Sequence, residues 1–299
     1  MKKRRLERFA LSRKPIFLAA MVLLLALGLF PLVTMPAEGR WTVPSTIPPS
    51  PSGHSPKLAQ PPIPTPTPIP LPESADVPIL MYHYVSELPA DADEYRRDLT
   101  VTPANFEAQM DYLAEADYHP ITLTDLHLHL SQGYPLPEKP VVLSFDDGYR
   151  DAYEVVFPHL LERGFTAVFF VLASPAHIES ADYLTWTQMK EMSDAGMSIQ
   201  AHGRDHVDLR DRDYAYLVYQ LVGIKEAIEY HTGQIPRFFC YPAGQYDADV
   251  ITVLESADYW GAVTTQWGRE HRLENRYELT RLRIRHSDTL ESFVSKLEE

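Results

Sequence analysis

Prolines concentrated between Pro36 and Pro72 split this chain of 299 residues into segments that cannot share one core. The stretch holds 13 of the chain's 26 prolines. Because proline has no backbone N–H to donate to a helix or a sheet, so dense a run predicts an extended, polyproline-type spacer. We therefore expect residues 36–76 to form a Pro-rich, disordered linker. Residues 77–299 remain, which is enough for one sizeable hydrophobic core.

The segment before the linker has the charge pattern of a membrane anchor. Residues 1–14 hold seven Lys or Arg residues and one acid, and residues 15–35 carry no charge. About twenty apolar residues suffice to cross a bilayer as a helix, and basic residues before the span predict a cytoplasmic N-terminus. The alternative is a cleaved signal peptide, but its apolar region is shorter and ends at a small-x-small site.

We favour the anchor because the span ends in Val-Thr-Met-Pro, a poor cleavage site. The expected arrangement is a basic cytoplasmic tail (1–14), a transmembrane anchor (15–35) and a body outside the cytoplasm, in the cell envelope. Residues 15–299 carry 20 basic and 40 acidic side chains, a net charge of −20. A body this acidic repels phosphate backbones and argues against nucleic-acid binding. The single cysteine, Cys240, excludes an internal disulfide and a cysteine-ligated zinc site.

From residue 77 onward, short β-rich runs alternate with helical segments. The strand candidates are residues 79–84, 141–145, 167–171, 197–201, 238–241, 260–264 and 282–285. The helix candidates are residues 103–116, 151–163, 185–195, 213–230, 247–256 and 289–297. Strands separated by helices of about 10–15 residues imply an α/β fold with a parallel sheet, open or closed into a barrel. In such folds, chemistry is found at the carboxyl ends of the strands.

Two acids and a glycine end the most apolar of these strands, in residues 141–148 (VVLSFDDG). Neighbouring side chains of a regular strand point to opposite faces, so Asp146 and Asp147 can share one pocket only if the chain bends. Gly148 permits such a bend. One carboxylate could then bind a metal while the other acts as a base. The alternative is an ordinary turn with solvated acids.

Two histidines directly follow the strand at 197–201, in the segment HGRDH. His202 and His206 are four residues apart, a spacing that places both on one face of a helical turn, within reach of one ion. The alternative is a pair of surface histidines. Together with one carboxylate from another strand end, they make three ligands that leave room for water and substrate. This is the open pattern of catalytic zinc, although the same donors suit cobalt, nickel or iron.

The sequence SFDDG, followed by His-x-x-x-His, resembles the NodB-type polysaccharide deacetylases of carbohydrate esterase family 4. The resemblance covers about residues 77–298. It implies a distorted (β/α) barrel of about seven strands and metal-dependent hydrolysis of N-acetyl groups on a glycan. It further implies that Asp146 is the general base and that Asp147, His202 and His206 bind the metal. We expect the protein to be a monomer that binds its glycan substrate and is attached to the membrane through its N-terminal anchor.

Residues 239–244 (FCYPAG) resemble the family's third motif, which forms a groove wall with a backbone donor for the oxyanion. The resemblance places Tyr241 and Ala243 in this wall. The family's usual arginine aligns with Cys240, so the group that normally holds the base is missing from the motif. Arg237 is a candidate substitute, with a plain surface arginine as the alternative. The second motif also departs from the family, because Gly203 lacks the hydroxyl usual after the first histidine.

Two histidines compete for the role of general acid. Residues 284–286 (IRH) partly resemble the family's closing Leu-x-His motif and point to His286. Residues 78–83 (PILMYH) resemble the opening of the poly-N-acetylglucosamine deacetylase branch, where this early histidine takes the acid's place. Residues 118–123 also fit that branch. We therefore favour His83 over His286, with a plain hydrogen-bonded histidine as the alternative for either.

The combined reading is a metal-dependent hydrolase that removes N-acetyl groups from an N-acetylglucosamine-containing polysaccharide and releases acetate. In this reading Asp146 takes a proton from the attacking water, the Ala243 N–H binds the oxyanion and His83 protonates the departing amine. Two alternatives remain open. The chain could be a surface glycan-binding module without turnover, which the missing motif arginine favours, or a deacylase for another N- or O-acyl group.

Overall fold

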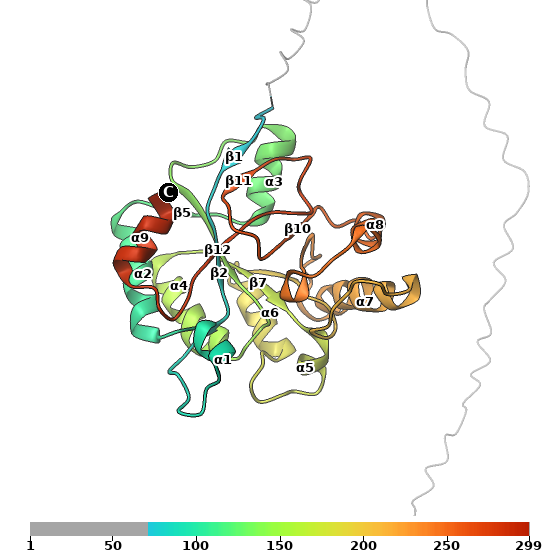
Figure 1. Cartoon of the computed structure of the whole chain (residues 1–299), viewed down its shortest axis with the longest axis horizontal. Helices are drawn as coiled ribbons and strands as arrows, with labels where there is room; N and C mark the ends of the chain where they lie inside the picture. Colours follow the sequence, from blue (N-terminus) through green and yellow to red (C-terminus); the bar gives the residue numbers. More distant parts are fainter. Residues whose placement is uncertain (1–70, 299) are drawn as a thin grey trace, which may run out of the picture. The chain divides into compact units, whose positions relative to one another are not determined.

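The computed structural model describes residues 71–298, which contain a curled sheet of parallel strands surrounded by helices (Figure 1). In spatial order the strands are β10 (Gly261–Val263), β9 (Phe238–Cys240), β8 (Ser198–Ala201), β7 (Val168–Val171), β6 (Pro140–Phe145), β2 (Ile79–Tyr82) and β12 (Leu282–Arg283). A two-residue strand, β5 (His119–Pro120), pairs with the start of β6. The seven predicted strands are confirmed, and their ends differ by at most two residues.

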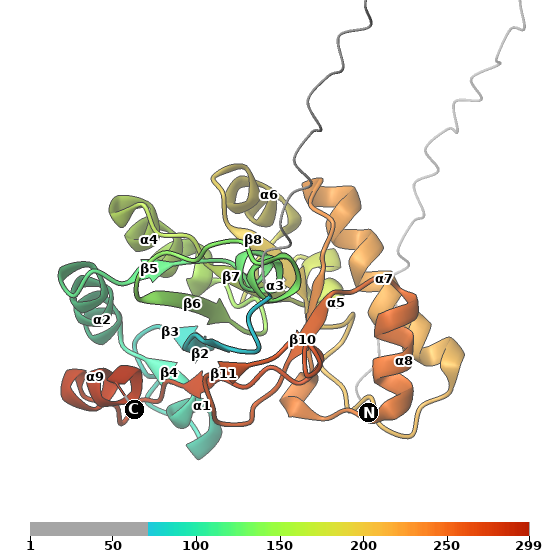
Figure 2. The same cartoon turned by 90° about the horizontal axis from the view of Figure 1, so that it is seen from above.

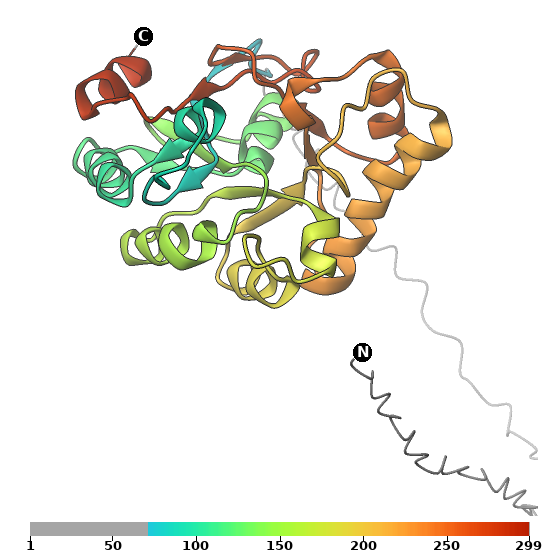
Figure 3. The ribbon, with the colours of Figure 1, turned by 60° about the horizontal axis from the view of Figure 1, so that its bottom comes forward.

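Six helices lie around the outside of this sheet, as Figure 2 shows. They are α2 (Pro103–Glu115), α4 (Phe157–Arg163), α6 (Trp186–Asp194), α7 (Tyr214–Thr232), α8 (Ala248–Ser256) and α9 (Leu290–Glu298). A π-helical turn (Ala152–Val156) leads into α4. The six predicted helices are confirmed with similar bounds, and α7 packs against both α6 and α8 (Figure 3).

Residues 71–298 contain further elements besides these strands and helices. Three further helices are α1 (Glu94–Asp98), α3 (Leu123–Gln132) and α5 (Ala173–His177). Two small ladders join β1 (Ala75–Asp76) to β11 (Glu270–His271) and β3 (Tyr84–Val85) to β4 (Thr100–Val101). Pro242–Gly244 form a 3-10 turn. Residues 75–76, which the sequence assigned to the linker, therefore belong to the folded part of the chain.

Local sequence explains why these helices begin where they do. Thr102 precedes α2, and its hydroxyl accepts a hydrogen bond from the Asn105 N–H at 3.3 Å. Pro103 then occupies the first turn, where a helix needs no N–H donor. Phe106 and Met110, four residues apart, are fully buried on the face that α2 turns toward the sheet.

The alternation of side chains along the strands produces two apolar layers. Leu143 and Phe145 of β6 face outward, into the layer between the sheet and the outer helices. Val142 faces the interior of the curl, where it packs with other inward side chains and with Leu126 of α3. Because α3 also contacts Phe238, the first residue of β9, it fills the interior at the end where the strands begin. The opposite end, at the strand carboxyl termini, is left for polar residues.

One segment, residues 279–283, joins the two margins of the curled sheet. Leu279 forms a parallel bridge with Val263 of β10, and its N–H donates to the Ala262 carbonyl at 3.0 Å. Three residues later, Leu282 pairs with Leu80 of β2. Within residues 71–298, β10 and β12 share no ladder, so the predicted distorted barrel takes the form of a seven-strand half-barrel with this segment across its gap.

The predicted membrane anchor cannot be located on this fold. The basic tail, the anchor and residues 36–70 of the linker lie outside the described residues. Among residues 71–298, no helix combines the length and the apolar character that crossing a bilayer requires.

Candidate active site

Both carboxylates at the end of β6 lie in one pocket. Asp146 is 3% and Asp147 5% exposed, and both line a hollow of about 360 Å³ at the carboxyl ends of the strands. The chain bends as predicted: Asp147 has φ +69° and Gly148 φ +70°, so two consecutive residues adopt the left-handed conformation. A Cβ at Gly148 would also lie only 3.3 Å from Val171, which favours glycine there.

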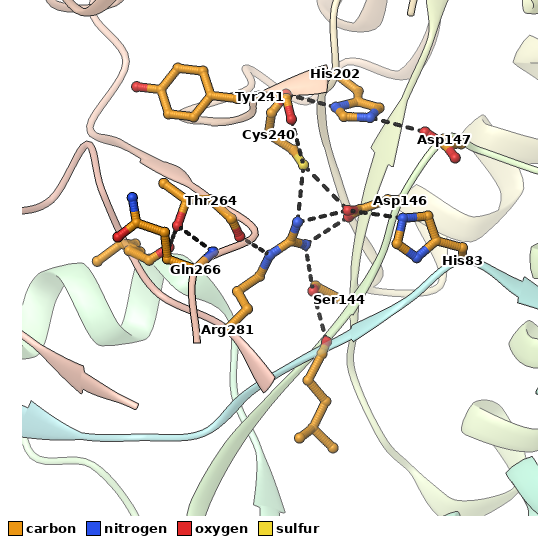
Figure 4. A network of polar contacts seen from close by, with 12 residues as sticks. His83, Ser144, Asp146, Asp147, His202, Cys240, Tyr241, Thr264, Gln266 and Arg281 are labelled. Atoms are coloured by element: carbon orange, nitrogen blue, oxygen red, sulfur yellow. Dashed lines mark hydrogen bonds and ion pairs between the residues drawn. The ribbon is translucent and has the colours of Figure 1, made fainter. Parts of the chain in front are cut away.

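A buried arginine holds Asp146. Arg281 donates from Nη1 to Asp146 Oδ1 at 2.8 Å and from Nη2 to Oδ2 at 2.7 Å, with its side chain fully buried (Figure 4). Its Nε donates to the Thr264 carbonyl, and Nη1 also donates to the Ser144 hydroxyl. Burial alone would raise the pKa of the Asp146 carboxyl, but the charge and hydrogen bonds of Arg281 outweigh burial and lower that pKa. Asp146 is therefore a fixed, ionised carboxylate.

The position of Arg281 explains why a cysteine stands in the third motif. The Cys240 sulfur lies 3.4 Å from Asp146 Oδ2 and 3.3 Å from Arg281 Nη2, so the small thiol leaves space that the guanidinium fills (Figure 4). Arg281 enters from the segment that bridges β10 and β2. The motif arginine is thus replaced by one that lies directly before β12, which the sequence analysis missed.

Arg237, the substitute suggested by the sequence, lies elsewhere. It precedes β9, at the end of the sheet opposite the carboxylates. Its guanidinium pairs with the exposed Asp258 and lies over the Trp260 ring at 5.1 Å. The expectation that Arg237 holds the base is therefore wrong, and its surface alternative describes what the structure shows.

The structure separates the two candidate acids. His83, which lies between β2 and β3, lines the hollow with its Nε2 3.8 Å from Asp146 Oδ2. Burial lowers the pKa of His83 below its ordinary value, although the neighbouring carboxylates favour its charged form. His286 instead bonds the Thr100 carbonyl through Nδ1 at 3.1 Å and is not among the residues that line the hollow.

Asp147, His202 and His206 converge on one point. One donor atom from each lies within 4.8 Å of the other two. Asp147 Oδ1 is 3.0 Å from His202 Nε2 and 3.5 Å from His206 Nε2. His202 is buried, whereas the His206 side chain is 44% exposed and opens the trio to the hollow.

The loop that carries the two histidines is a bend rather than the helical turn expected from their spacing. Gly203 has φ +100°, which explains glycine at a position where a hydroxyl residue is usual. The buried Gln220 of α7 fixes the bend: its Oε1 accepts from the Arg204 and Asp205 N–H groups, each at 3.0 Å. The two imidazoles still meet, with ring centroids 5.2 Å apart.

The chemistry of this trio fits a divalent cation. His202 Nδ1 lies 2.6 Å from the Cys240 carbonyl, which can only accept, so Nδ1 carries a proton. In a neutral ring Nε2 then presents its lone pair to the Asp147 carboxylate, and two such atoms 3.0 Å apart require a proton or a cation between them. Burial opposes a proton, but the Cys240 and Asp147 side chains raise the pKa of His202 well above its ordinary value. A metal ion would satisfy the same atoms without charging a buried ring.

Tyr241 and Ala243 complete one wall of the hollow. Tyr241 is buried, and its hydroxyl donates to the Tyr277 carbonyl at 3.0 Å. Ala243 adopts φ +53° within the turn that follows β9. Both line the same hollow as the carboxylates, as predicted.

Replacing Gln220 with leucine should weaken the binding of a divalent cation, with zinc as the probe, about 10–100-fold while the protein stays folded. The reason is that two loop N–H groups lose their acceptor, so that His206 loses its fixed position. Zinc titration with a competing chelator measures this. Gln234→Leu is the matched control, since Gln234 also bonds two backbone groups, those of Met197 and Ile199, at the far end of β8. Equal zinc affinities in the two variants would show that Gln220 does not position the loop.

The family model for polysaccharide deacetylases matches residues 133–262, which contain both carboxylates and both histidines of the site. YxkH of Bacillus subtilis, which is named as a polysaccharide deacetylase, is 32% identical over 210 residues, covering 70% of this chain and 72% of YxkH.

Two further matches extend the comparison. The poly-β-1,6-N-acetyl-D-glucosamine N-deacetylase of Escherichia coli is 31% identical over 127 residues, which cover 38% of this chain and only 18% of that enzyme. Among solved structures, the Streptococcus pyogenes deacetylase PplD, in complex with acetate, superposes with a TM-score of 0.70 at 28% identity. That match covers 75% of this chain and 99% of PplD.

Proposed function

The chain belongs to the polysaccharide deacetylase family, and from this premise we propose that it hydrolyses N-acetyl groups from a polymer of N-acetylglucosamine with the help of a divalent metal ion. The observation that carries the proposal is the pairing of an arginine-held carboxylate with an Asp-His-His trio in one hollow. The similarity to a poly-β-1,6-N-acetyl-D-glucosamine deacetylase supports this sugar.

In the proposed reaction, Asp146 is the general base. It accepts a proton from the water that attacks the amide carbon, and Arg281 keeps both carboxylate oxygens ionised and oriented for this step. Because Arg281 also lowers the pKa of the Asp146 carboxyl, Asp146 is a weaker base. In return, it is ionised and correctly oriented when the water binds. A fixed geometry of this kind supplies much of the rate gain in hydrolytic enzymes.

His83 is the proposed general acid. Its Nε2 lies 3.8 Å from Asp146 Oδ2, so a proton accepted by the carboxylate has a short path to the imidazole. The imidazole then protonates the nitrogen as the C–N bond breaks, which leaves a free amine on the sugar and acetate as the second product. Tyr241 and Ala243 line the same hollow, and we propose that they contact the acetyl group.

Asp147, His202 and His206 would hold the metal ion, and zinc is the ion we propose. When bound there, the ion would polarise the carbonyl and favour ionisation of water near neutral pH. The carbonyl of Cys240 fixes the His202 ring, so that Nε2 faces the shared point.

A glycan-binding module without turnover was the main alternative, because the third motif lacks its arginine. Arg281 removes that support, since a base held by two hydrogen bonds serves hydrolysis and has no purpose in binding alone. The other alternative, a deacylase for another N- or O-acyl group, predicts acetate release from an O-acetylated glycan and none from an N-acetylglucosamine polymer.

Acetate release from a panel of glycans tests the proposal. The panel contains poly-β-1,6-N-acetylglucosamine, β-1,4-linked N-acetylglucosamine oligomers, peptidoglycan and an O-acetylated xylan. We expect release from an N-acetylglucosamine polymer, its loss in the chelated, metal-free protein and its recovery with zinc or cobalt. Release from the xylan alone would contradict the sugar assignment, and full activity without metal would contradict the metal.

We further propose that the folded part acts outside the cytoplasm, tethered by residues 15–35. The support is the charge pattern of residues 1–35 and the proline-rich spacer after it. Recovery of the full chain in the soluble fraction of its cells, uncleaved, would contradict the tether.

A further inference from the structure

Within the described part of the chain, no hydrogen bond to a protein group holds the ring of His83, the proposed general acid. Its Nδ1 is buried and has no partner among residues 71–298. Its Nε2 lies 3.8 Å from Asp146 Oδ2, which is too far for a hydrogen bond. In histidines that transfer protons, a partner on the second ring nitrogen commonly sets the orientation of the ring. Here the backbone on either side of His83 must supply that orientation.

The backbone is held differently before and after His83. Tyr82, the residue before it, ends β2 and lies in the main sheet. The residues after it form β3, whose ladder among residues 71–298 is with β4 alone. The N–H groups of Tyr84 and Ser86 donate to carbonyls in and beside β4, each at 3.1 Å. Because successive N–H groups of a strand point to opposite edges, that of Val85 points away from β4.

Asp151 occupies this second edge of β3. Its Oδ2 accepts from the Val85 N–H at 3.0 Å, at the place where the carbonyl of a neighbouring strand would lie. Val85 is fully buried, so its N–H needs a partner. Asp151 lies in the segment that follows Asp147, and its carboxylate makes no capping hydrogen bond to the π-helical turn after it. The carboxylate therefore joins the segment that carries the base to the segment that carries the acid.

Arg96 of α1 strengthens the contact between these two segments. Its Nη2 donates to the Ser86 hydroxyl at 2.8 Å, and its guanidinium lies over the Tyr84 ring, 3.1 Å from the centroid. The same ring stacks on Tyr149, with centroids 3.6 Å apart. Tyr84 directly follows His83, and Tyr149 lies between Asp147 and Asp151 in the chain. Side-chain stacking and the Asp151 hydrogen bond thus act on the same two segments.

The Asp151 carboxyl is kept in this position against the effect of burial. Burial raises its pKa to about 6, although the Val85 N–H and the positive charge of Arg96 favour the ionised form. At neutral pH the group is therefore ionised. Carboxyls with a pKa shifted in this way are concentrated at functional sites.

From these contacts we propose that Asp151 is a positioning residue for the general acid: it holds β3 against the segment that follows β6 and so fixes the His83 ring beside Asp146. Asp151 does not line the hollow that contains the carboxylates, so it acts through the backbone of Val85. The inference rests on the proposed function, in which His83 protonates the departing amine, and adds what orients that group.

Asp151→Leu tests the proposal by acetate release. Leucine has a similar size but removes the acceptor, so kcat should fall about 10–100-fold, the effect expected when a catalytic group is slightly misplaced. KM and the content of bound metal should stay near their native values, because Asp151 is not one of the three converging residues. Native kcat in a folded Asp151→Leu protein would overturn the proposal. Asp151→Glu, whose longer side chain displaces β3, gives the same comparison if the leucine variant does not fold.

Two further variants separate positioning from stability. Asp151→Asn keeps an oxygen that can accept from the Val85 N–H, so it should retain most of the native kcat. Asp247→Leu is the matched control, because Asp247 Oδ2 also accepts a distant N–H, that of Asp211 at 2.8 Å, and Asp247 does not line the hollow. It should lower the unfolding temperature and leave kcat unchanged. The proposal is wrong if either Asp151→Asn or Asp247→Leu loses as much kcat as Asp151→Leu.

A spectroscopic measurement separates this proposal from the proposed function. In isotope-labelled protein, with signals assigned through His83→Gln, the NMR signals of the His83 ring nitrogens should shift and broaden in Asp151→Leu but not in Asp247→Leu. This measurement needs no turnover. If no glycan yields acetate but the His83 signals respond to Asp151→Leu, the proposed function is wrong and the positioning contact stands. If acetate is released and the His83 signals stay unchanged in Asp151→Leu, the function stands and the positioning role is wrong.

Discussion

Replacing Asp146 with asparagine should lower acetate release from an N-acetylglucosamine polymer by about two to four orders of magnitude. The amide keeps the shape of the carboxylate but cannot accept the proton of the attacking water. The content of bound metal should stay at the native level, because Asp146 is not among the three residues whose donor atoms converge. The measurement is kcat for acetate release together with elemental analysis of the same preparation.

Asp147→Asn provides the matched control for this result. It alters the neighbouring carboxylate but should act by reducing the content of bound metal, so that added zinc or cobalt partly restores its activity. Thermal unfolding must accompany both variants, since asparagine at 146 leaves the buried Arg281 guanidinium without its counter-charge. Native activity in a folded Asp146→Asn protein would show that another group takes the proton.

The location of the site could be predicted from sequence because it depends on a simple rule of parallel sheets. An apolar run that ends in polar residues, as in 141–148, or a strand candidate followed directly by histidine, as in 197–202, predicts a strand whose carboxyl end bears chemistry. The bend at Asp147 and Gly148 also followed from the local sequence, since two adjacent acids cannot otherwise share one pocket. Features that involve only one strand and its end could therefore be predicted from the sequence.

The role of Arg281 could not be predicted in this way, because it depends on which side chains of the segment point to the interior of the curled sheet. Residues 281–285 alternate arginine with apolar side chains, a pattern typical of a strand with one solvated face. Here the arginine face turns toward the interior and mouth of the half-barrel: Arg281 bonds Asp146, Arg283 lines the hollow and Arg285 pairs with Asp98. The signal in the sequence was the small Cys240 in place of the motif arginine, which leaves room for a side chain from elsewhere.

The sequence correctly predicted that His202 and His206 lie together, but the reason given for it was wrong. The four-residue spacing suggested a helical turn, whereas the chain forms a bend that requires φ +100° at Gly203 and three hydrogen bonds to Gln220. Gln220 lies in the middle of an otherwise apolar helix face, and only the packing of α7 against this loop shows its purpose. The residues missed from sequence, Arg281 and Gln220, are those whose side chains bond residues of a distant part of the chain.

Arg281→Leu should have the second large effect, on both stability and activity. Removing one partner of a buried ion pair costs about 3–5 kcal/mol, because the other charge stays buried without compensation. Asp146 would then lose its fixed orientation, and its pKa should rise once the guanidinium no longer offsets burial. We expect kcat to fall about 100-fold or more, in line with loss of a positioned base. Chemical denaturation and acetate release measure the two effects, and Arg281→Lys keeps the charge in case the leucine variant does not fold.

The double variant Cys240→Arg with Arg281→Leu distinguishes a positioning role from a purely structural one. Position 240 is where the family's arginine normally stands, and its sulfur already lies 3.4 Å from Asp146 Oδ2. An arginine there can reach the carboxylate through the space that Arg281 vacates, so the double variant should recover part of the activity that Arg281→Leu loses. Cys240→Arg alone should only destabilise, because two guanidinium groups cannot share that space. If the double variant unfolds less readily than Arg281→Leu but remains equally inactive, Arg281 supports the fold and does not position the base.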